Sequence, residues 1–141
     1  RLDRRQLRHL QEDLHKPPTS VRGGLQDVIE ELYLENQILD HFNPTDKRTW
    51  KQRYFRRTEL YKEGGPVFIY IGGEGQEGAR RLASGKLFMT YLAERFRAKM
   101  YDLEHRYYGF SHPTPDLSSA SLQYLSADQA LADLAYFIEY L

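Results

Sequence analysis

The residues with the clearest chemical potential form a glycine-rich segment, Gly72-Gly73-Glu74-Gly75-Gln76-Glu77-Gly78, directly after an apolar run. Glycine leaves the backbone uncovered, so amide N–H groups there can reach a negatively charged oxygen of a ligand. Our candidates for such an oxyanion loop are Gly72, Gly73, Glu74 and Gly75. In acyl transfer, a backbone N–H of this kind stabilises the negative oxygen of the reacting carbonyl. Taken alone, the glycines are about equally compatible with a tight strand exit that binds nothing.

The same segment matches a second glycine pattern, Gly73-x-Gly75-x-x-Gly78, which occurs in dinucleotide-binding loops. Asp102 and Glu104 follow near the end of the next predicted strand, where an acid could bind ribose hydroxyls. Acidic residues inside the loop would lie beside a diphosphate, however, and the next apolar helix face begins only about ten residues after the last glycine. A dinucleotide-binding domain therefore stays an alternative, and our main prediction includes no cofactor.

The closest match to a nucleophile elbow is Gly109-Phe110-Ser111-His112-Pro113, in which proline replaces the final glycine. Proline cannot open the tight helix entry that exposes a serine, so we do not expect Ser111 to be a nucleophile. His105 and Asp102 could complete a triad with it on paper, but no spacing brings the three together. The scattered histidines lack metal-ligand spacing, and we predict no metal site.

Arg106 is expected to have a structural partner in the glycine-rich loop. We predict that Glu74 pairs with Arg106 and favour this pairing over an alternative in which Glu74 binds the free amino group of a substrate. His105 and Arg106 would then close a strand end and hold the rim of a site through hydrogen bonds.

Strands must position this loop. Val67–Ile71 is a continuous β-branched and aromatic run, typical of a strand buried on both faces. Two further strands are predicted at Leu34–Phe42 and Thr49–Phe55, joined into a hairpin by the turn residues Asn43-Pro44-Thr45-Asp46. The short apolar pattern over residues 25–32 predicts one or two amphipathic helical turns before the hairpin.

Helices and one more strand follow the loop. An apolar face predicts a helix from Phe88 to Phe96, and Ala98–Leu103 can form the next strand. Ser126 begins another helix with Gln129 three residues later, a capping-box pattern. One face of that helix is expected to carry Leu131, Leu134, Ala135, Ile138 and Leu141. The class is therefore α/β, with the order hairpin, buried strand, glycine loop, helix, strand, helix.

Composition excludes several classes of protein. The chain has 141 residues, a formal net charge of zero and a pI near 7.2, which does not fit the basic footprint of a nucleic-acid binder. No run approaches the roughly 18 apolar residues of a membrane span. There is no Cys, which excludes a thiolate metal site and a cysteine nucleophile. Residues 1–30 read as a polar helix or tail with a linker, and residues 31–141 as the folded domain.

Five blocks in the same order resemble the S28 serine peptidases, a family that includes prolyl carboxypeptidase, dipeptidyl peptidase II and thymus-specific serine protease. The resemblance covers residues 37–138. Its blocks are Gln37-Ile38-Leu39-Asp40-His41-Phe42, Lys51-Gln52-Arg53-Tyr54-Phe55, Gly64-Gly65-Pro66 running through Phe68 to Gly75, Glu104-His105-Arg106-Tyr107-Tyr108-Gly109, and Tyr124-Leu125-Ser126 with Gln129-Ala130-Leu131-Ala132-Asp133.

The resemblance implies a serine-type exopeptidase built on an α/β-hydrolase fold, acting as a dipeptidyl-peptidase or a Pro-Xaa carboxypeptidase. Its substrates would be peptides, proline-containing ones among them, and its location lysosomal or extracellular. The active-site rim candidates are Glu104, His105, Arg106 and Tyr107. A non-catalytic, hydrolase-like interaction module is a further alternative.

No Gly-x-Ser-x-Gly occurs in the sequence, and the family places its nucleophile Ser, then Asp and His, beyond the helix that Ser126 begins. The sequence starts with Arg1, ends at Leu141 inside a helical pattern, and opens with no signal-peptide pattern. We therefore expect an N-terminal fragment, residues 31–141 being the first part of the hydrolase domain, with no catalytic residue and no peptidase activity by itself.

Overall fold

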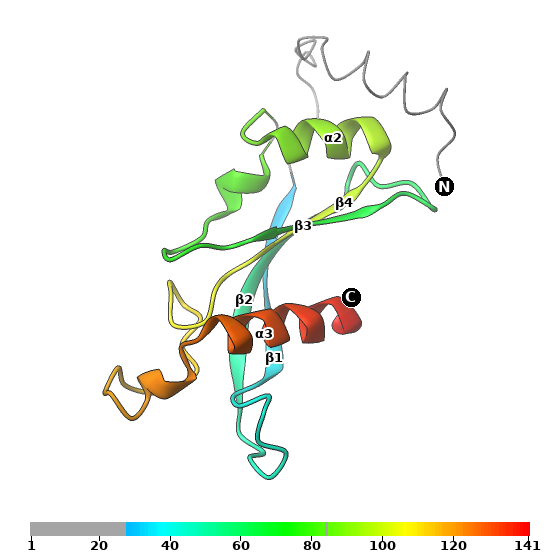
Figure 1. Cartoon of the computed structure of the whole chain (residues 1–141). Coiled ribbons are helices and arrows are strands. Elements are labelled where there is room, and N and C mark those ends of the chain that lie inside the picture. Colours follow the sequence, from blue (N-terminus) through cyan, green and yellow to red (C-terminus); the bar gives the residue numbers. More distant parts are fainter. Residues whose placement is uncertain (1–27, 84) are drawn as a thin grey trace.

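A computed structural model of the chain describes residues 28–83 and 85–141 (Figure 1). Apart from its last three residues, the predicted polar segment 1–30 lies outside this part. The described residues form one mixed sheet flanked by helices. The strands are β1 (Ile29–Ile38), β2 (Thr49–Arg57), β3 (Val67–Ile71) and β4 (Lys99–Leu103). The helices are α2 (Phe88–Phe96) and α3 (Ala127–Tyr140), and the short 3-10 turns are η1 (Ala79–Leu82) and η2 (Leu122–Tyr124).

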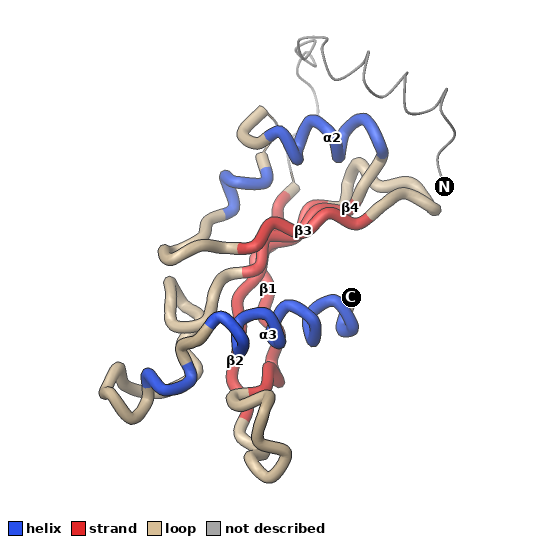
Figure 2. Tube along the Cα trace, viewed as in Figure 1, coloured by secondary structure: helices blue, strands red, loops and turns tan. Residues whose placement is uncertain are grey.

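The sheet has the strand order β1-β2-β4-β3 (Figure 2). β2 pairs antiparallel with both β1 and β4, whereas β3 and β4 run parallel, with Tyr70 opposite Asp102. A parallel pair needs a crossover connection, which η1 and α2 provide here. The structure confirms the mixed α/β class.

Each face of the sheet has its own core, because side chains alternate along a strand. On one face Tyr54, Tyr101 and Leu103 pack with Phe137 of α3, whose ring centroid lies 5.0 Å from that of Tyr54. On the other face, buried residues from β2 and β4 pack with η1, α2 and the residue before β4; they are Phe55, Leu82, Ala93, Ala98 and Met100. The sheet is thus a middle layer between α2 and α3 (Figure 1).

The predicted hairpin is confirmed, but its first strand is displaced. β1 begins at Ile29, where we expected helical turns, and ends at Ile38 rather than Phe42. The spacing of Ile29 and Leu32 fits a helix locally, but this segment instead pairs with β2, Ile29 opposite Arg57. A bulge between Leu34 and Gln37 shifts the register, and both of these side chains are buried.

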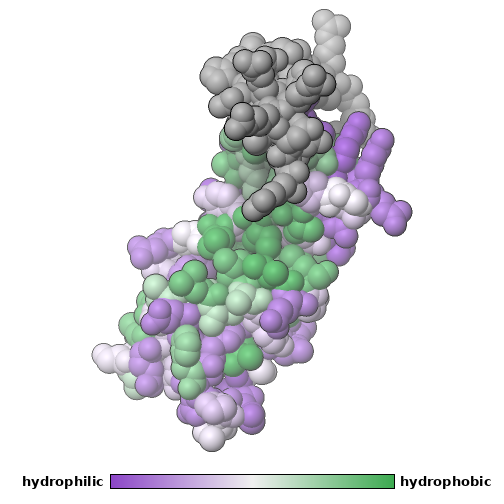
Figure 3. All heavy atoms as spheres, turned by 45° about the vertical axis from the view of Figure 1, so that its right-hand side comes forward, coloured by the Kyte–Doolittle hydropathy of each residue, from purple (hydrophilic) through white to green (hydrophobic). Residues whose placement is uncertain are grey.

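β3 has the predicted bounds, but the prediction that it is buried on both faces is wrong. Within the described residues it pairs only with β4, so it is an edge strand. Its first and last residues, Val67 and Ile71, are 48% and 55% exposed. The space-filling view shows apolar surface gathered in a band across one face of the molecule (Figure 3).

Ser126 caps α3 as predicted, since its hydroxyl accepts a hydrogen bond from Gln129 N. The predicted apolar face of this helix, however, is not the buried one. Leu131 is 63% exposed and Ile138 54% exposed, while Gln129, Asp133 and Phe137 are buried. The reason is that two of the buried positions carry polar side chains with partners elsewhere in the fold. In the same way, α2 buries Thr90 and Ala93 and leaves Phe88 and Phe96 exposed.

Candidate functional site

The glycine-rich loop, residues 72–78, and the segment after β4, residues 104–117, start at the same edge of the sheet, because β3 and β4 are parallel. In open α/β sheets this carboxyl edge is where ligands bind. The two segments contact each other there, and they contain all four oxyanion candidates and all four rim candidates.

The loop uses most of its own backbone donors. Gly72 N donates to Leu103 O at 2.8 Å, which extends the β3–β4 ladder by one bond, and Gly75 N donates to Gly73 O at 2.9 Å. Gly73 N donates to the Glu77 carboxylate at 3.3 Å. Glu74 N–H forms no hydrogen bond with any other described residue. Of the four candidates, Glu74 therefore holds the amide that is available to a ligand.

Gly72 is required by close packing. A Cβ at this position would lie 2.7 Å from Leu103 O, a distance that real side chains essentially never adopt. A Cβ at Gly73 or Gly75 would meet no atom within 4 Å. Gly72 thus serves the approach of β3 to β4, while the other two glycines leave the loop open.

Glu104 is a buried acceptor that joins the segments of the site. It lies at the end of β4 with no exposed surface. Arg53 donates to both of its carboxylate oxygens, at 2.5 and 3.2 Å. Ser111 Oγ and Phe110 N donate to Oε2 at 2.7 and 2.9 Å, and Glu77 N donates to Oε1 at 3.1 Å. One carboxylate therefore ties β2 to both loops.

Gly109 gives a test of this arrangement. It has a φ of +56°, and a Cβ there would lie 1.9 Å from Glu104 Oε1. We expect Gly109→Ala to destabilise the protein by at least about 2 kcal/mol, because a left-handed backbone is strained with a side chain and Glu104 must move. The midpoint of denaturant unfolding measures this. Gly78→Ala, whose Cβ meets nothing within 4 Å, is the control, and equal midpoints for the two variants would contradict the packing described.

Ser111, His105 and Asp102 do not form a triad. Ser111 is fully buried, donates to Glu104 and accepts a bond from Arg53 N at 2.9 Å. His105 Nδ1 lies 2.8 Å from the carbonyl of the next residue, and Asp102 has no hydrogen-bond partner among the described residues. Ser111 is a structural serine in this fold, as the proline after His112 indicated.

The predicted pairing of Glu74 with Arg106 is wrong. Arg106 is fully buried, and its Nε and Nη2 each donate to the carboxylate of Asp133 on α3 at 2.7 Å. Glu74 is exposed in the loop. The buried Arg106 guanidinium finds its acceptors on the α3 side of the sheet. Besides the Asp133 carboxylate, they include the carbonyl of Tyr124, at 2.8 Å.

The fourth rim candidate, Tyr107, is buried and has a φ of +69°. Its N–H donates to Ser111 O at 2.7 Å, and its hydroxyl donates to Ser121 O at 2.5 Å. Tyr107 is thus a buried structural residue whose two hydrogen bonds connect parts of the loop after β4.

Asp102 is the unusual group beneath the loop. It is fully buried on β4, and neither carboxylate oxygen has a hydrogen-bond partner among the described residues. Arg81 Nε lies 3.6 Å away, too far for a good hydrogen bond. Burial, and then the charge of Glu77, raise the pKa of Asp102 to about 7. A large fraction of the Asp102 carboxyl is therefore protonated near neutral pH.

The structural roles of Arg53, Glu77 and Asp133 were not predicted. Arg53 and Asp133 are fully or almost fully buried although they are charged. A charge at a buried position of a strand or helix is a signal of a buried ion pair, but it does not name the partner. For Asp133, the signal lay in its spacing from Phe137 four residues later.

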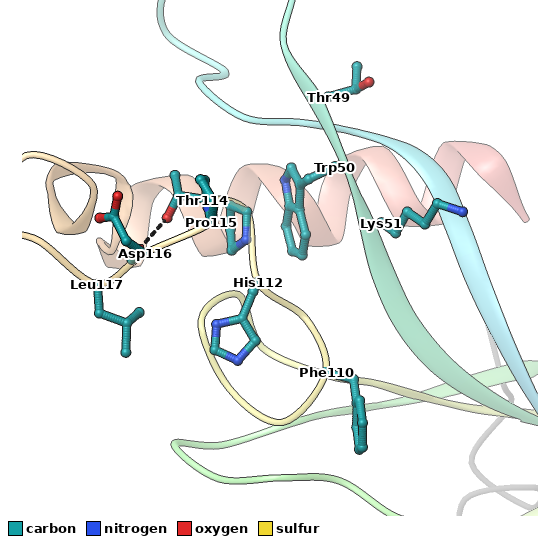
Figure 4. A pocket seen from close by; sticks show the side chains of 10 residues that line it. Thr49, Trp50, Lys51, Phe110, His112, Thr114, Pro115, Asp116 and Leu117 are labelled. Carbon is teal, nitrogen blue, oxygen red and sulfur yellow. Dashed lines mark hydrogen bonds between the residues drawn. The ribbon is translucent and has the colours of Figure 1, made fainter.

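A groove of about 660 Å³ lies at the same sheet edge, between the first half of β2 and the loop after β4 (Figure 4). Its lining side chains come from these two segments alone: Thr49, Trp50, Lys51, Phe110, His112, Pro113, Thr114, Pro115, Asp116 and Leu117. Phe110 connects it to the glycine-rich loop, because the Phe110 ring stacks 4.4 Å from the Arg53 guanidinium, which donates to Glu77 O.

The edge of β2 is open along this groove, since β4 pairs only with Tyr54–Arg57. Backbone groups of an antiparallel strand alternate between its two neighbours. Arg48 O bonds toward β1, and Arg53 bonds away from it, to Ser111 and Glu104. By this alternation the N–H and C=O groups of Thr49 and Lys51 face the groove without a partner strand.

Residues 28–83 and 85–141 lack two other kinds of feature, a metal-binding cluster and a membrane-spanning helix. No cluster of three or more His, Cys, Asp or Glu side chains there is placed to hold a metal ion. None of the helices described is long and apolar enough to cross a membrane.

Comparison with known proteins gives a consistent result. A family model described as serine carboxypeptidase S28 matches residues 37–141. A protein named as a serine protease in Caenorhabditis elegans is 39% identical over 134 residues, which are 94% of this chain and 25% of that protein. The thymus-specific serine protease of Mus musculus is 40% identical over 139 residues, 92% of this chain and 26% of that protein.

A third relative, lysosomal Pro-X carboxypeptidase of Mus musculus, is 39% identical over 114 residues, which cover 78% of this chain and 23% of that protein. The chain therefore spans about a quarter of the length of the curated relatives it matches.

Proposed function

The chain belongs to the serine carboxypeptidase S28 family, and from this we propose that the protein containing it is a serine-type exopeptidase, a dipeptidyl-peptidase or a Pro-Xaa carboxypeptidase. Residues 31–141 are then the N-terminal portion of its α/β-hydrolase domain. One observation supports the role of this portion: Glu74 N–H, in an open loop at the carboxyl edge of the parallel strands, has no hydrogen-bond partner among the described residues. That is the place of an oxyanion donor in such folds.

In the proposed reaction, the hydroxyl of a serine outside these 141 residues attacks the peptide carbonyl carbon and gives its proton to a histidine. The carbonyl oxygen becomes negative and accepts a hydrogen bond from Glu74 N–H. A second donor is the N–H of the residue after the nucleophile. The tetrahedral intermediate collapses to an acyl-enzyme as the amine leaves with the proton from histidine, and water then releases the acid.

Two relatives support a proposed lysosomal or extracellular location. One is named a lysosomal Pro-X carboxypeptidase, and a protein of Arthroderma benhamiae, 42% identical over 105 residues, is named an extracellular serine carboxypeptidase. Their names also guide the choice of proline-containing peptides as test substrates.

The proposal is tested with the full-length protein. We expect it to hydrolyse proline-containing dipeptide amides or peptides with a penultimate proline, and to lose this activity when a serine-directed fluorophosphonate labels it. Residues 1–141 alone should neither hydrolyse nor become labelled. A full-length protein that does neither would favour a non-catalytic interaction module. Labelling and hydrolysis by residues 1–141 would contradict a nucleophile outside them.

We also propose that part of the peptide lies in the groove as an added strand on β2. Thr49 N–H would donate to the peptide backbone. Thr49→Pro removes that N–H at the first residue of a strand, where proline is tolerated. The expected result is about a fivefold rise in KM with kcat unchanged, since one hydrogen bond contributes about 1 kcal/mol. Thr49→Val keeps the N–H and should behave as wild type, and a KM of Thr49→Pro within twofold of the control would exclude this strand.

A further inference from the structure

We propose that Glu77 positions the oxyanion loop through its bond to Gly73 N–H, and that a proton on Asp102, donated to the Glu77 carboxylate, keeps Glu77 in that place. Both residues would act on the reaction through Glu74, without touching substrate themselves. This inference rests on the proposed role of the loop as an oxyanion site.

Glu77 is held from several sides, which makes it the fixed point of the loop. It is 3% exposed. Its N–H donates to Glu104 at 3.1 Å, and its carbonyl accepts from Arg53 at 2.9 Å. Its carboxylate accepts from Gly73 N–H and from Arg81 Nε. The peptide between Gly72 and Gly73, which directly precedes the peptide that carries Glu74 N–H, therefore takes its direction from a buried side chain.

The charges below the loop do not balance. Three buried carboxyl groups, those of Glu77, Asp102 and Glu104, face the two guanidinium groups of Arg53 and Arg81. Glu104 receives the two bonds of Arg53, and Glu77 receives that of Arg81. Asp102 has no donor among the described residues. An isolated buried carboxylate is strongly unfavourable, so the excess carboxyl is expected to hold a proton.

Every element around Asp102 contributes a group that bears on this proton. Burial raises the pKa of Asp102 most, and Glu77 from the loop raises it further. Arg81 from η1 lowers this pKa, and Glu104, directly after β4, raises it slightly. From β3, the hydroxyl of Tyr70 accepts a bond from Arg81 at 3.1 Å. From β2, Arg53 is already paired with Glu104 and, at its other end, with the exposed Glu31.

Loss of the proton would change the loop. Arg81 Nε lies beside both the Glu77 and the Asp102 carboxylates, and Glu77 raises the pKa of Asp102. In the proposed state a protonated Asp102 donates to the Glu77 carboxylate, whereas two neighbouring carboxylates would repel each other. Glu77 would then move from Gly73, and Glu74 N–H would lose its fixed direction. We therefore expect kcat to fall as the pH rises above about 7, because the protonated fraction falls about tenfold for each further pH unit.

The first test compares wild-type full-length protein with Asp102→Asn, measuring kcat for one peptide substrate between about pH 5 and pH 9. Asparagine has the shape of the protonated acid and keeps a donor toward Glu77 at every pH. We expect kcat of the variant at about pH 9 to exceed that of wild type at least fivefold. Asp128→Asn, at an exposed position on α3, is the control for charge and should follow wild type. An Asp102→Asn profile that superimposes on wild type would overturn the proposal.

The second test separates positioning from folding. Glu77→Ala removes the acceptor of Gly73 N–H and should lower kcat about tenfold while KM stays within twofold, because the lost contact acts in the transition state. Glu77→Gln keeps an acceptor and should restore kcat to within about threefold of wild type. Equal kcat values for the two variants would contradict the role of Glu77. If Glu77→Ala does not fold, the dependence of kcat on pH in Asp102→Asn still tests the proposal.

Hydrolysis and labelling of the wild-type full-length protein test the proposed function independently of any variant. Hydrolysis and fluorophosphonate labelling of wild type, together with an unchanged Asp102→Asn profile, would leave a serine peptidase and remove only the inference about Glu77 and Asp102. An inactive, unlabelled wild type would remove the proposed function itself.

Discussion

Replacing Glu74 with proline is expected to lower kcat of the full-length protein by about 100- to 1000-fold, the usual effect of losing one oxyanion donor. Proline has no N–H to donate. Its ring fixes φ at a negative value, and Glu74 is not among the residues with a positive φ, so this backbone does not exclude proline on that ground. KM should change little, because the bond to the oxygen strengthens only as charge develops there. Steady-state hydrolysis of a proline-containing peptide amide gives both constants.

Glu74→Gln is the matched control, since it keeps the N–H and removes the exposed carboxylate. Its kcat should stay within about threefold of wild type. A large loss in this control, especially as a rise in KM, would show that the carboxylate binds the amino group of the substrate. A Glu74→Pro variant with wild-type kcat would place the oxyanion donor elsewhere.

Replacing Arg106 with methionine is expected to destabilise the protein by about 3–5 kcal/mol, because it leaves a buried carboxylate without its main partner. Arg106 donates twice to Asp133 and also to the carbonyls of Leu39 and Tyr124, at 3.2 and 2.8 Å. The only other side chain bonded to that carboxylate in the described part of the chain is His41, at 2.8 Å. Denaturant unfolding of the full-length protein, followed by tryptophan fluorescence, measures the loss.

A second arginine supplies the control. Arg48 pairs with Asp46 at the surface, with its side chain 60% exposed, so Arg48→Met should lower stability far less than Arg106→Met does. Combining Arg106→Met with Asp133→Leu removes both buried charges and should recover at least about half of the loss. Similar losses for Arg48→Met and Arg106→Met would contradict the importance of the buried pair.

Local sequence patterns predicted the elements well where neighbours along the chain decide the outcome. The bounds of β3 and α2 and the cap of α3 at Ser126 depend on adjacent glycines, apolar spacing and one side-chain bond. Ile29 and Leu32 fit both a helix and a strand, and pairing with β2 decided between them. The buried face of α3 could not be predicted, because Asp133 points inward to bond with Arg106 and His41, which come from other segments.

The candidate site shows the same division. The glycine-rich loop could be located from its residues, but the amide that stays free could not. That depends on Leu103, which takes the N–H of Gly72, and on Glu77, which takes that of Gly73. Both bonds join residues that the sequence gives no reason to pair. The isolation of the buried Asp102 carboxyl could not be predicted either. It arises because the nearby donors Arg53 and Arg81 bond to Glu104 and Glu77 instead.

The edge strand β3 has a practical consequence for work with residues 1–141 alone. Val67-Phe68-Ile69-Tyr70-Ile71 contains no charge, and within the described residues one side of its backbone has no partner. Uncharged, apolar edges pair readily with the same edge of another copy, because nothing repels the approaching strand. Residues 1–141 alone should therefore self-associate through β3 as the protein concentration rises. Dilute samples, or a charged residue introduced at position 67 or 71, should keep the isolated segment monomeric.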